Sequence, residues 1–133
     1  MSILFDTGVV IDLEHLDLDR HGADQALVSA VTVGELAFGL DVPDEAQRTA
    51  RTARFRSVLD GFEIVPFGVE EAKLFGALAS LVRSGGRNPR PRRLGLQIAA
   101  TAAAARVPLL TTNPADFSGL DRLVTVVPVE RRT

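Results

Sequence analysis

Short apolar runs alternate with longer segments in which apolar residues recur at helical spacing, along nearly the whole chain. The short runs predict β-strands, at residues 3–5, 27–31, 62–67, 109–112 and 123–127. The periodic segments between them predict helices, at residues 9–16, 32–40, 44–59, 69–82 and 96–107. This alternation is typical of right-handed βαβ units. We therefore predict an α/β fold in three α/β/α layers, around a mostly parallel central sheet of about five strands.

Composition limits the protein to few classes. A chain of 133 residues with 46% hydrophobic content fits one domain with its own core, and we expect that domain to span residues 1–133. The absence of cysteine excludes disulfides and thiolate metal sites. Leu94 to Ala105 is the longest uncharged stretch, and it is shorter than the roughly 18 residues of a membrane span. We expect a cytoplasmic protein without a membrane partner.

Three acidic residues, Asp6, Glu35 and Asp116, each stand just beyond a predicted strand. In an open parallel sheet, residues past the carboxyl ends of neighbouring strands gather in one crevice. Gathered carboxylates repel one another unless a cation compensates them, and Mg²⁺ or Mn²⁺ accepts oxygen ligands of this kind. The pattern therefore predicts a divalent-metal site.

Each acid also has a simpler explanation when it is taken alone. Asp6 precedes a predicted helix and suits an N-cap, while Glu35 lies three residues after Thr32, as in a capping box. Asp116 follows Asn113 and Pro114, where an acid in a first helical turn meets the helix dipole. Capping does not require the three caps to converge, however. Their occurrence after three different strands favours a shared site.

Arginine is concentrated in one loop. Of the fifteen basic residues only Lys73 is a lysine, and five arginines lie between residues 83 and 93, among two glycines and two prolines that exclude regular structure. The planar guanidinium matches phosphate oxygens in a bidentate way. A solvated loop in a protein from a GC-rich genome is the alternative, and both explanations stay open. The candidate phosphate-binding residues are Arg87, Arg90, Arg92 and Arg93.

Four different short motifs follow one another along the chain. They are LFDTGVVI at residues 4–11, SAVTVGEL at 29–36, IAATA at 98–102 and LTTNPADF at 110–117. Together they resemble the PIN-domain ribonucleases and, within them, the VapC-type toxins of bacterial toxin–antitoxin pairs. The resemblance covers essentially the whole chain.

This resemblance implies an α/β/α fold, a homodimer, and an endoribonuclease that hydrolyses RNA with Mg²⁺ or Mn²⁺. It also implies a cognate antitoxin whose tail can occupy the acidic cleft. Asp6, Glu35 and Asp116 would hold the metal and act in catalysis, while Thr7 and Asn113 would support them. The arginine-rich loop would then hold the RNA backbone.

Two positions depart from the family's pattern where the site should be. The family usually has Asp three residues before its Ile-Ala-Ala motif, and this chain has Gly95 there. It commonly has Asn or Ser two residues after the first acid, where this chain has Gly8. Glycine offers no side chain to hold a metal or orient a ligand. We interpret Gly95 as a tolerable helix N-cap, and we expect activity to be weakened or lost while stability survives.

Two other functions remain open. A catalytically silent module that binds an antitoxin, and RNA as well, is supported mainly by Gly95. A phosphotransfer module shares the layout of acids after strands, but such proteins have a second acid beside the first and a lysine after a late strand. Here the sole lysine, Lys73, lies within a predicted helix.

Overall fold

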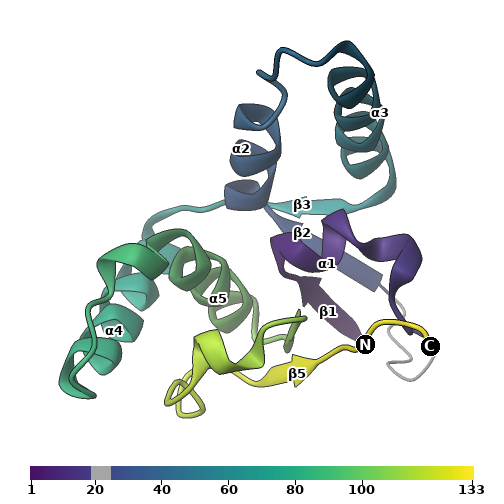
Figure 1. Ribbon diagram of the computed structural model, residues 1–133. Helices are drawn as coiled ribbons and strands as arrows, with labels where there is room; N and C mark the ends of the chain where they lie inside the picture. The colour runs from purple at the N-terminus through teal and green to yellow at the C-terminus, as the bar shows by residue number, and fades with distance from the viewer. Residues whose placement is uncertain (19–24) are drawn as a thin grey trace.

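The computed structural model describes residues 1–18 and 25–133, which form a five-stranded sheet with helices on both faces (Figure 1). Its strands are β1 (Ser2–Phe5), β2 (Gln25–Ser29), β3 (Glu63–Val65), β4 (Leu109–Thr111) and β5 (Val126–Pro128). Their order is β3-β2-β1-β4-β5, and each neighbouring pair is parallel. The predicted three-layer α/β/α fold is confirmed.

Within the described residues, five helices and three short 3-10 turns connect the strands. The helices are α1 (Thr7–Ile11), α2 (Ala30–Phe38), α3 (Glu45–Gly61), α4 (Val69–Ser84) and α5 (Arg93–Ala105). The 3-10 turns are η1 (Leu13–His15), η2 (Arg90–Arg92) and η3 (Pro114–Phe117). Figure 1 shows α2 and α3 standing together as an arm above the sheet. No helix in the described ranges is long and apolar enough to cross a membrane.

Alternating side chains of the strands divide the core in two. On β1, Leu4 faces the cluster built by α4 and α5, while Ile3 and Phe5 face the cluster that holds α1 and Val58 of α3. All three are almost fully buried. Successive strand residues point to opposite faces, so apolar runs without alternation are what a sheet covered on both sides requires.

Helix α5 is the most buried helix, as its apolar sequence predicts. Most of its residues between Leu96 and Ala102 are buried, and it packs closely on α4. Its alanines allow that close approach because they have little side chain to separate the backbones. The helix begins at Arg93, however, so Gly95 lies inside its first turn. The interpretation of Gly95 as an N-cap is therefore wrong.

Helix α2 also begins earlier than predicted. Strand β2 ends at Ser29, whose hydroxyl oxygen accepts a hydrogen bond from the Val31 amide (3.1 Å) and caps the helix. Thr32 is consequently buried inside α2, and the predicted capping box between Thr32 and Glu35 is wrong. At the other end of the sheet, residues 121–123 form a turn, so the last strand starts at Val126 and not at residue 123.

A buried pair of hydroxyls ties β2 to α5. Ser29 and Thr101 are fully buried, and their side-chain oxygens lie 3.0 Å apart. Thr101 donates its hydrogen to the Gln97 carbonyl (2.9 Å), so Ser29 must be the donor between the two hydroxyls. This bond fixes the helix that begins with the arginine-rich segment against the strand that leads into α2.

We expect Thr101→Val to lower the free energy of unfolding by about 1–3 kcal/mol, because the buried Ser29 hydroxyl would lose its acceptor. Chemical denaturation would measure the loss. Ser29→Ala should also destabilise, and the double variant should lose less than the sum of the two, since it leaves no unpaired hydroxyl. Thr49→Val, on the exposed face of α3, is the control. Equal losses at residues 49 and 101 would contradict this account.

Candidate active site

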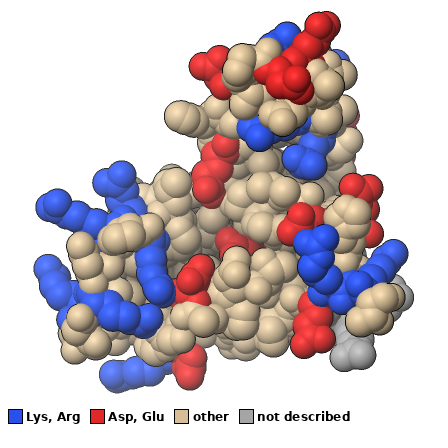
Figure 2. Space-filling view, viewed as in Figure 1, with Lys and Arg blue, Asp and Glu red and all other residues tan. Residues whose placement is uncertain are grey.

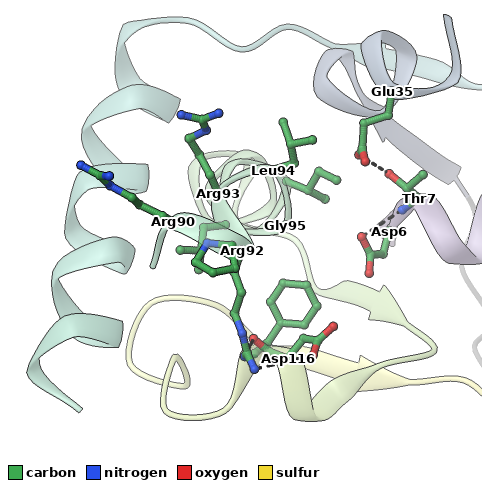
Figure 3. Close-up of a pocket in the computed structure, with 13 residues that line it drawn as sticks. Asp6, Thr7, Glu35, Arg90, Arg92, Arg93, Leu94, Gly95 and Asp116 are labelled. Carbon is green, nitrogen blue, oxygen red and sulfur yellow. Dashed lines mark hydrogen bonds and ion pairs between the residues drawn. The ribbon is translucent and has the colours of Figure 1, made fainter. Parts of the chain in front are cut away.

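Three predicted acids line one pocket at the carboxyl edge of the sheet (Figure 3). Asp6 directly follows β1, Glu35 lies on α2 after β2, and Asp116 lies in η3 after β4. Strand β1 is central, with β2 on one side and β4 on the other, so the chain order reverses beside it. Ligands of open α/β sheets bind at such a reversal. The pocket has a volume of about 410 Å³.

Asp6 is both a helix cap and a wall of the pocket. One carboxylate oxygen accepts from the Thr7 amide (2.9 Å), and the other accepts from the Thr111 hydroxyl (2.8 Å). Burial raises the pKa of Asp6 above its ordinary value, and the nearby charge of Asp116 raises it further. The two hydrogen bonds lower the pKa without cancelling the rise. The ionised group thus lies where a cation would stabilise it.

Glu35 is oriented by Thr7. The Thr7 hydroxyl donates to Oε1 of Glu35 (2.8 Å) and lies 2.9 Å from the hydroxyl of Thr32. Because the Thr7 hydrogen goes to the carboxylate, Thr32 must donate to Thr7. A chain of two hydroxyls therefore runs from inside α2 to Glu35, which aims the carboxylate at the pocket.

Asp116 is held by arginine. Its side chain is 59% exposed, and a guanidinium nitrogen of Arg92 lies 3.9 Å from its carboxylate. Arg92 also donates to the Asp116 carbonyl, and Arg87 donates to the Ser118 carbonyl, each at 2.7 Å. These two arginines were predicted to bind RNA phosphates. In the structure they fasten η3, the turn that carries the third acid.

The other two predicted arginines, Arg90 and Arg93, line the rim of the pocket and are exposed, with their guanidinium groups extending away from the acids (Figure 3). Within the described ranges, neither guanidinium makes a hydrogen bond or an ion pair. Both charges are therefore available to an anion that enters the pocket. The arginine-rich segment divides into one pair that positions the backbone and one pair at the rim.

Sequence reasoning missed Thr111 and overvalued Asn113. Thr111 is fully buried. Its hydroxyl donates a hydrogen bond to Asp6 and accepts one from the backbone amide of Asn113 (3.0 Å). The Asn113 side chain is exposed, lies outside the pocket lining, and is 3.5 Å from the Thr112 hydroxyl. The register of β1 against β4, in which Phe5 pairs with Leu110, sets Thr111 beside Asp6. A polar residue ending a buried strand was the signal for it.

The two glycines that depart from the family's pattern differ in the space around them. A Cβ at Gly95 would meet only the Phe117 ring, at 3.9 Å, which is ordinary contact. A Cβ at Gly8 would lie 3.1 Å from the Thr112 hydroxyl, so Thr112 would have to move. The pocket can therefore accept an aspartate at residue 95, but a larger residue at position 8 needs an adjustment.

Comparison with known proteins identifies the family. A family model described as "PIN domain" matches residues 3–123. The chain belongs to the PIN-domain family. It is 31% identical over 140 residues to "Ribonuclease VapC" of Rickettsia bellii (strain RML369-C), a match covering 98% of this chain and 99% of that protein. The predicted resemblance is confirmed.

Solved structures agree with the family assignment. VapBC-5 of Mycobacterium tuberculosis, described as a member of the VapBC family of toxin–antitoxin systems, has 30% identity, a TM-score of 0.80 and 96% coverage of both chains. A toxin–antitoxin complex from Klebsiella pneumoniae has 26% identity and a TM-score of 0.65, with 94% of this chain and 95% of that chain covered.

The acids of this PIN domain have the right chemistry for a hard divalent ion, but they do not form a compact coordination site. Three carboxylates supply oxygen donors, and because burial raises the pKa of Asp6, a cation would stabilise its ionised form. Among the described residues, however, no three acidic, histidine or cysteine side chains form a ready metal-binding group. The expected compact cluster is therefore only a shared pocket, in which Thr7 holds Glu35 and Gly95 contributes no ligand.

We expect Asp6→Asn to raise the melting temperature of the metal-free PIN domain at pH 7. Burial raises the pKa of Asp6 in the folded state, so ionisation of Asp6 lowers stability progressively as the pH rises from the ordinary pKa to the folded one. The gain should be complete above the folded pKa and should disappear below the ordinary value of 3.8. Thermal unfolding in EDTA from pH 7 downward would measure it. Asp116→Asn, at an exposed site, is the control, and an equal gain there would contradict the explanation.

Proposed function

We propose that this PIN domain is a VapC-type toxin that cleaves RNA as a divalent-metal-dependent endoribonuclease. The observation that carries the proposal is the meeting of Asp6, Glu35 and Asp116 in one pocket, at the switch point of the sheet. A full-length relative named a ribonuclease supports the reaction class. Mg²⁺ or Mn²⁺ is the ion that an all-oxygen donor set favours.

In this proposal the three carboxylates would bind the cation, and the bound ion would lower the pKa of a water and stabilise charge on the phosphodiester. The chain's own hydroxyls would keep the ligands in place: Thr111 and the Thr7 amide orient Asp6, while the Thr7 hydroxyl orients Glu35. Arg92 would hold the turn of Asp116. Arg90 and Arg93 at the rim would attract the RNA backbone.

Toxin–antitoxin relatives support a protein partner. The M. tuberculosis and K. pneumoniae structures are described as a toxin–antitoxin family member and a toxin–antitoxin complex. We propose that this chain also binds a cognate antitoxin, forms a homodimer, and acts in the cytoplasm as a single domain.

A catalytically silent module that binds an antitoxin is the second candidate, and Gly95 favours it. Residue 95 lines the acidic pocket in the first turn of α5. An aspartate at this position would add a carboxylate to the pocket and would interact favourably with the positive end of the helix dipole. Without that carboxylate the pocket has one fewer oxygen donor for a cation. The two candidates predict different behaviour of the same protein.

We expect Gly95→Asp to raise metal-dependent cleavage of a mixed RNA pool by about 10- to 100-fold, the range by which the loss of a residue supporting a metal ligand lowers affinity or activity. The variant should fold, because its Cβ meets only the Phe117 ring at 3.9 Å. Cleavage in Mn²⁺ and Mg²⁺ would be followed by gel electrophoresis, with a calorimetric Mn²⁺ titration as a readout independent of activity.

Two controls give this experiment its meaning. EDTA and Asp6→Ala should each abolish cleavage by the wild type and by the Gly95→Asp variant. Cleavage that survives EDTA would refute the metal-dependent nuclease. A folded Gly95→Asp protein that binds Mn²⁺ no better and cuts no RNA would make the silent module the better description.

A further inference from the structure

A second cavity adjoins the acidic pocket at Glu35. This second cavity has a volume of about 270 Å³ and shares Thr7 and Glu35 with the acidic pocket. Its remaining wall comes from Ile11, from the end of α2 and from α3, which contributes Arg51 and Arg54. The hydrogen-bonded pair of Thr7 and Glu35 therefore lies between two cavities, each with arginines of its own.

Arg51 and Arg54, two of the four arginines of α3, occupy the same face of the helix, because residues three apart are neighbours there. Arg51 donates to the Gly39 carbonyl (2.7 Å) at the end of α2, which keeps its guanidinium at the cavity wall. Arg54 is half-buried, and its guanidinium has no hydrogen bond or ion pair with any residue in the described ranges. A partly buried cation without a counter-charge favours the arrival of an anion.

Positive charge thus stands on both sides of the acids. Figure 2 shows basic side chains over the α4 and α5 side of the molecule and others on the underside of the arm, with acidic side chains between them. Arg90 and Arg93 supply the free charges of the first side, since Arg87 and Arg92 are engaged with η3. Without these arginines, a polyanion that passes over Asp6 and Glu35 would be repelled by the acids and attracted by no cation on either side of them.

We propose that the second cavity is a phosphate-binding subsite, in which Arg51 and Arg54 hold the backbone of single-stranded RNA one or more nucleotides away from the cleaved bond. This inference rests on the proposed ribonuclease function and assigns the path of its substrate. The strand runs from Arg90 and Arg93, across the acids, to α3.

The position of the second cavity beside the acidic pocket favours an RNA phosphate over an acidic peptide. An RNA chain that places one phosphodiester at Asp6 and Glu35 carries further phosphates at regular intervals on both sides, so it needs cations on both sides. Ile11 and Leu36 give the cavity an apolar part that suits a ribose. The forked guanidinium of Arg54 fits two phosphate oxygens together.

The test measures RNA affinity without cleavage. In the Asp6→Asn background, with Mg²⁺, fluorescence anisotropy follows a labelled single-stranded RNA of about 12 nucleotides, a length within the site sizes of single-strand binders. We expect Arg54→Ala to weaken binding to all RNA sequences alike. The slope of log affinity against log salt should become shallower by about 0.7, the value for one lost phosphate contact on a single strand.

Arg56→Ala is the matched control, because Arg56 is exposed on the same helix and lies outside the lining of the second cavity. It removes the same charge from α3 but no contact in the second cavity. The slope of log affinity against log salt should therefore stay unchanged. Arg54→Gln, which retains most of the aliphatic stem, repeats the test in case the alanine variant is unstable. In the protein that retains Asp6, Arg54→Ala should raise KM for RNA with kcat little changed.

A second measurement needs no substitution at residue 54. Short RNAs containing 4-thiouridine should crosslink to the peptide of α3 as well as to the segment of Arg90 and Arg93, as mass spectrometry would show. Equal salt slopes for Arg54→Ala and Arg56→Ala, with no crosslink to α3, would overturn the subsite. The arm formed by α2 and α3 would then be a candidate surface for a protein partner.

The outcomes separate this inference from the function beneath it. Salt-dependent RNA binding that weakens in Arg54→Ala, in a protein that never cleaves RNA, would support the subsite and refute the nuclease. Cleavage and RNA binding that do not change in Arg54→Ala would support the nuclease and refute the subsite. Absence of any RNA binding would refute both.

Discussion

The burial of one carboxylate, Asp6, in a pocket that it shares with two other acids at the carboxyl edge of a parallel sheet is the constraint on which the site depends. The sheet order places β1 between β2 and β4, so residues following these strands meet in one pocket. Burial and the charge of Asp116 both raise the pKa of Asp6, which shows that the arrangement costs stability in the absence of a cation. The fold concentrates negative charge there, and metal binding would relieve it.

Threonine hydroxyls keep two of those carboxylates, Asp6 and Glu35, in position. Thr111 donates to Asp6, Thr7 donates to Glu35, and Thr32 supports Thr7 from within α2. Ser29 and Thr101 fix α5 against β2 by the same kind of bond. Each hydroxyl has a single hydrogen to donate, so the direction of each bond follows from its neighbours. The positions of Asp6 and Glu35 are thus set by uncharged groups.

Arginines of one short segment serve two different purposes. Arg87 and Arg92 each donate to a backbone carbonyl of the turn around Asp116, which fixes that turn against the start of α5. Arg90 and Arg93 keep their charge at the rim of the pocket. Sequence position alone could not separate these pairs, because all four residues share one loop and one chemistry. The distinction depends on which carbonyls lie within reach.

The sequence by itself determined the sheet, its layers and the three acids, because a strand buried on both faces must be continuously apolar and the acids lie where such runs end. Four ordered motifs added the family. Only the tertiary structure decided that Ser29 caps α2, which frees Glu35 for the pocket, and that Thr111 stands beside Asp6. It also decided that Asn113 stays outside the pocket, and it placed Arg54 against the far side of Glu35. These facts depend on strand register and helix packing between residues distant in the chain, which local pattern does not contain.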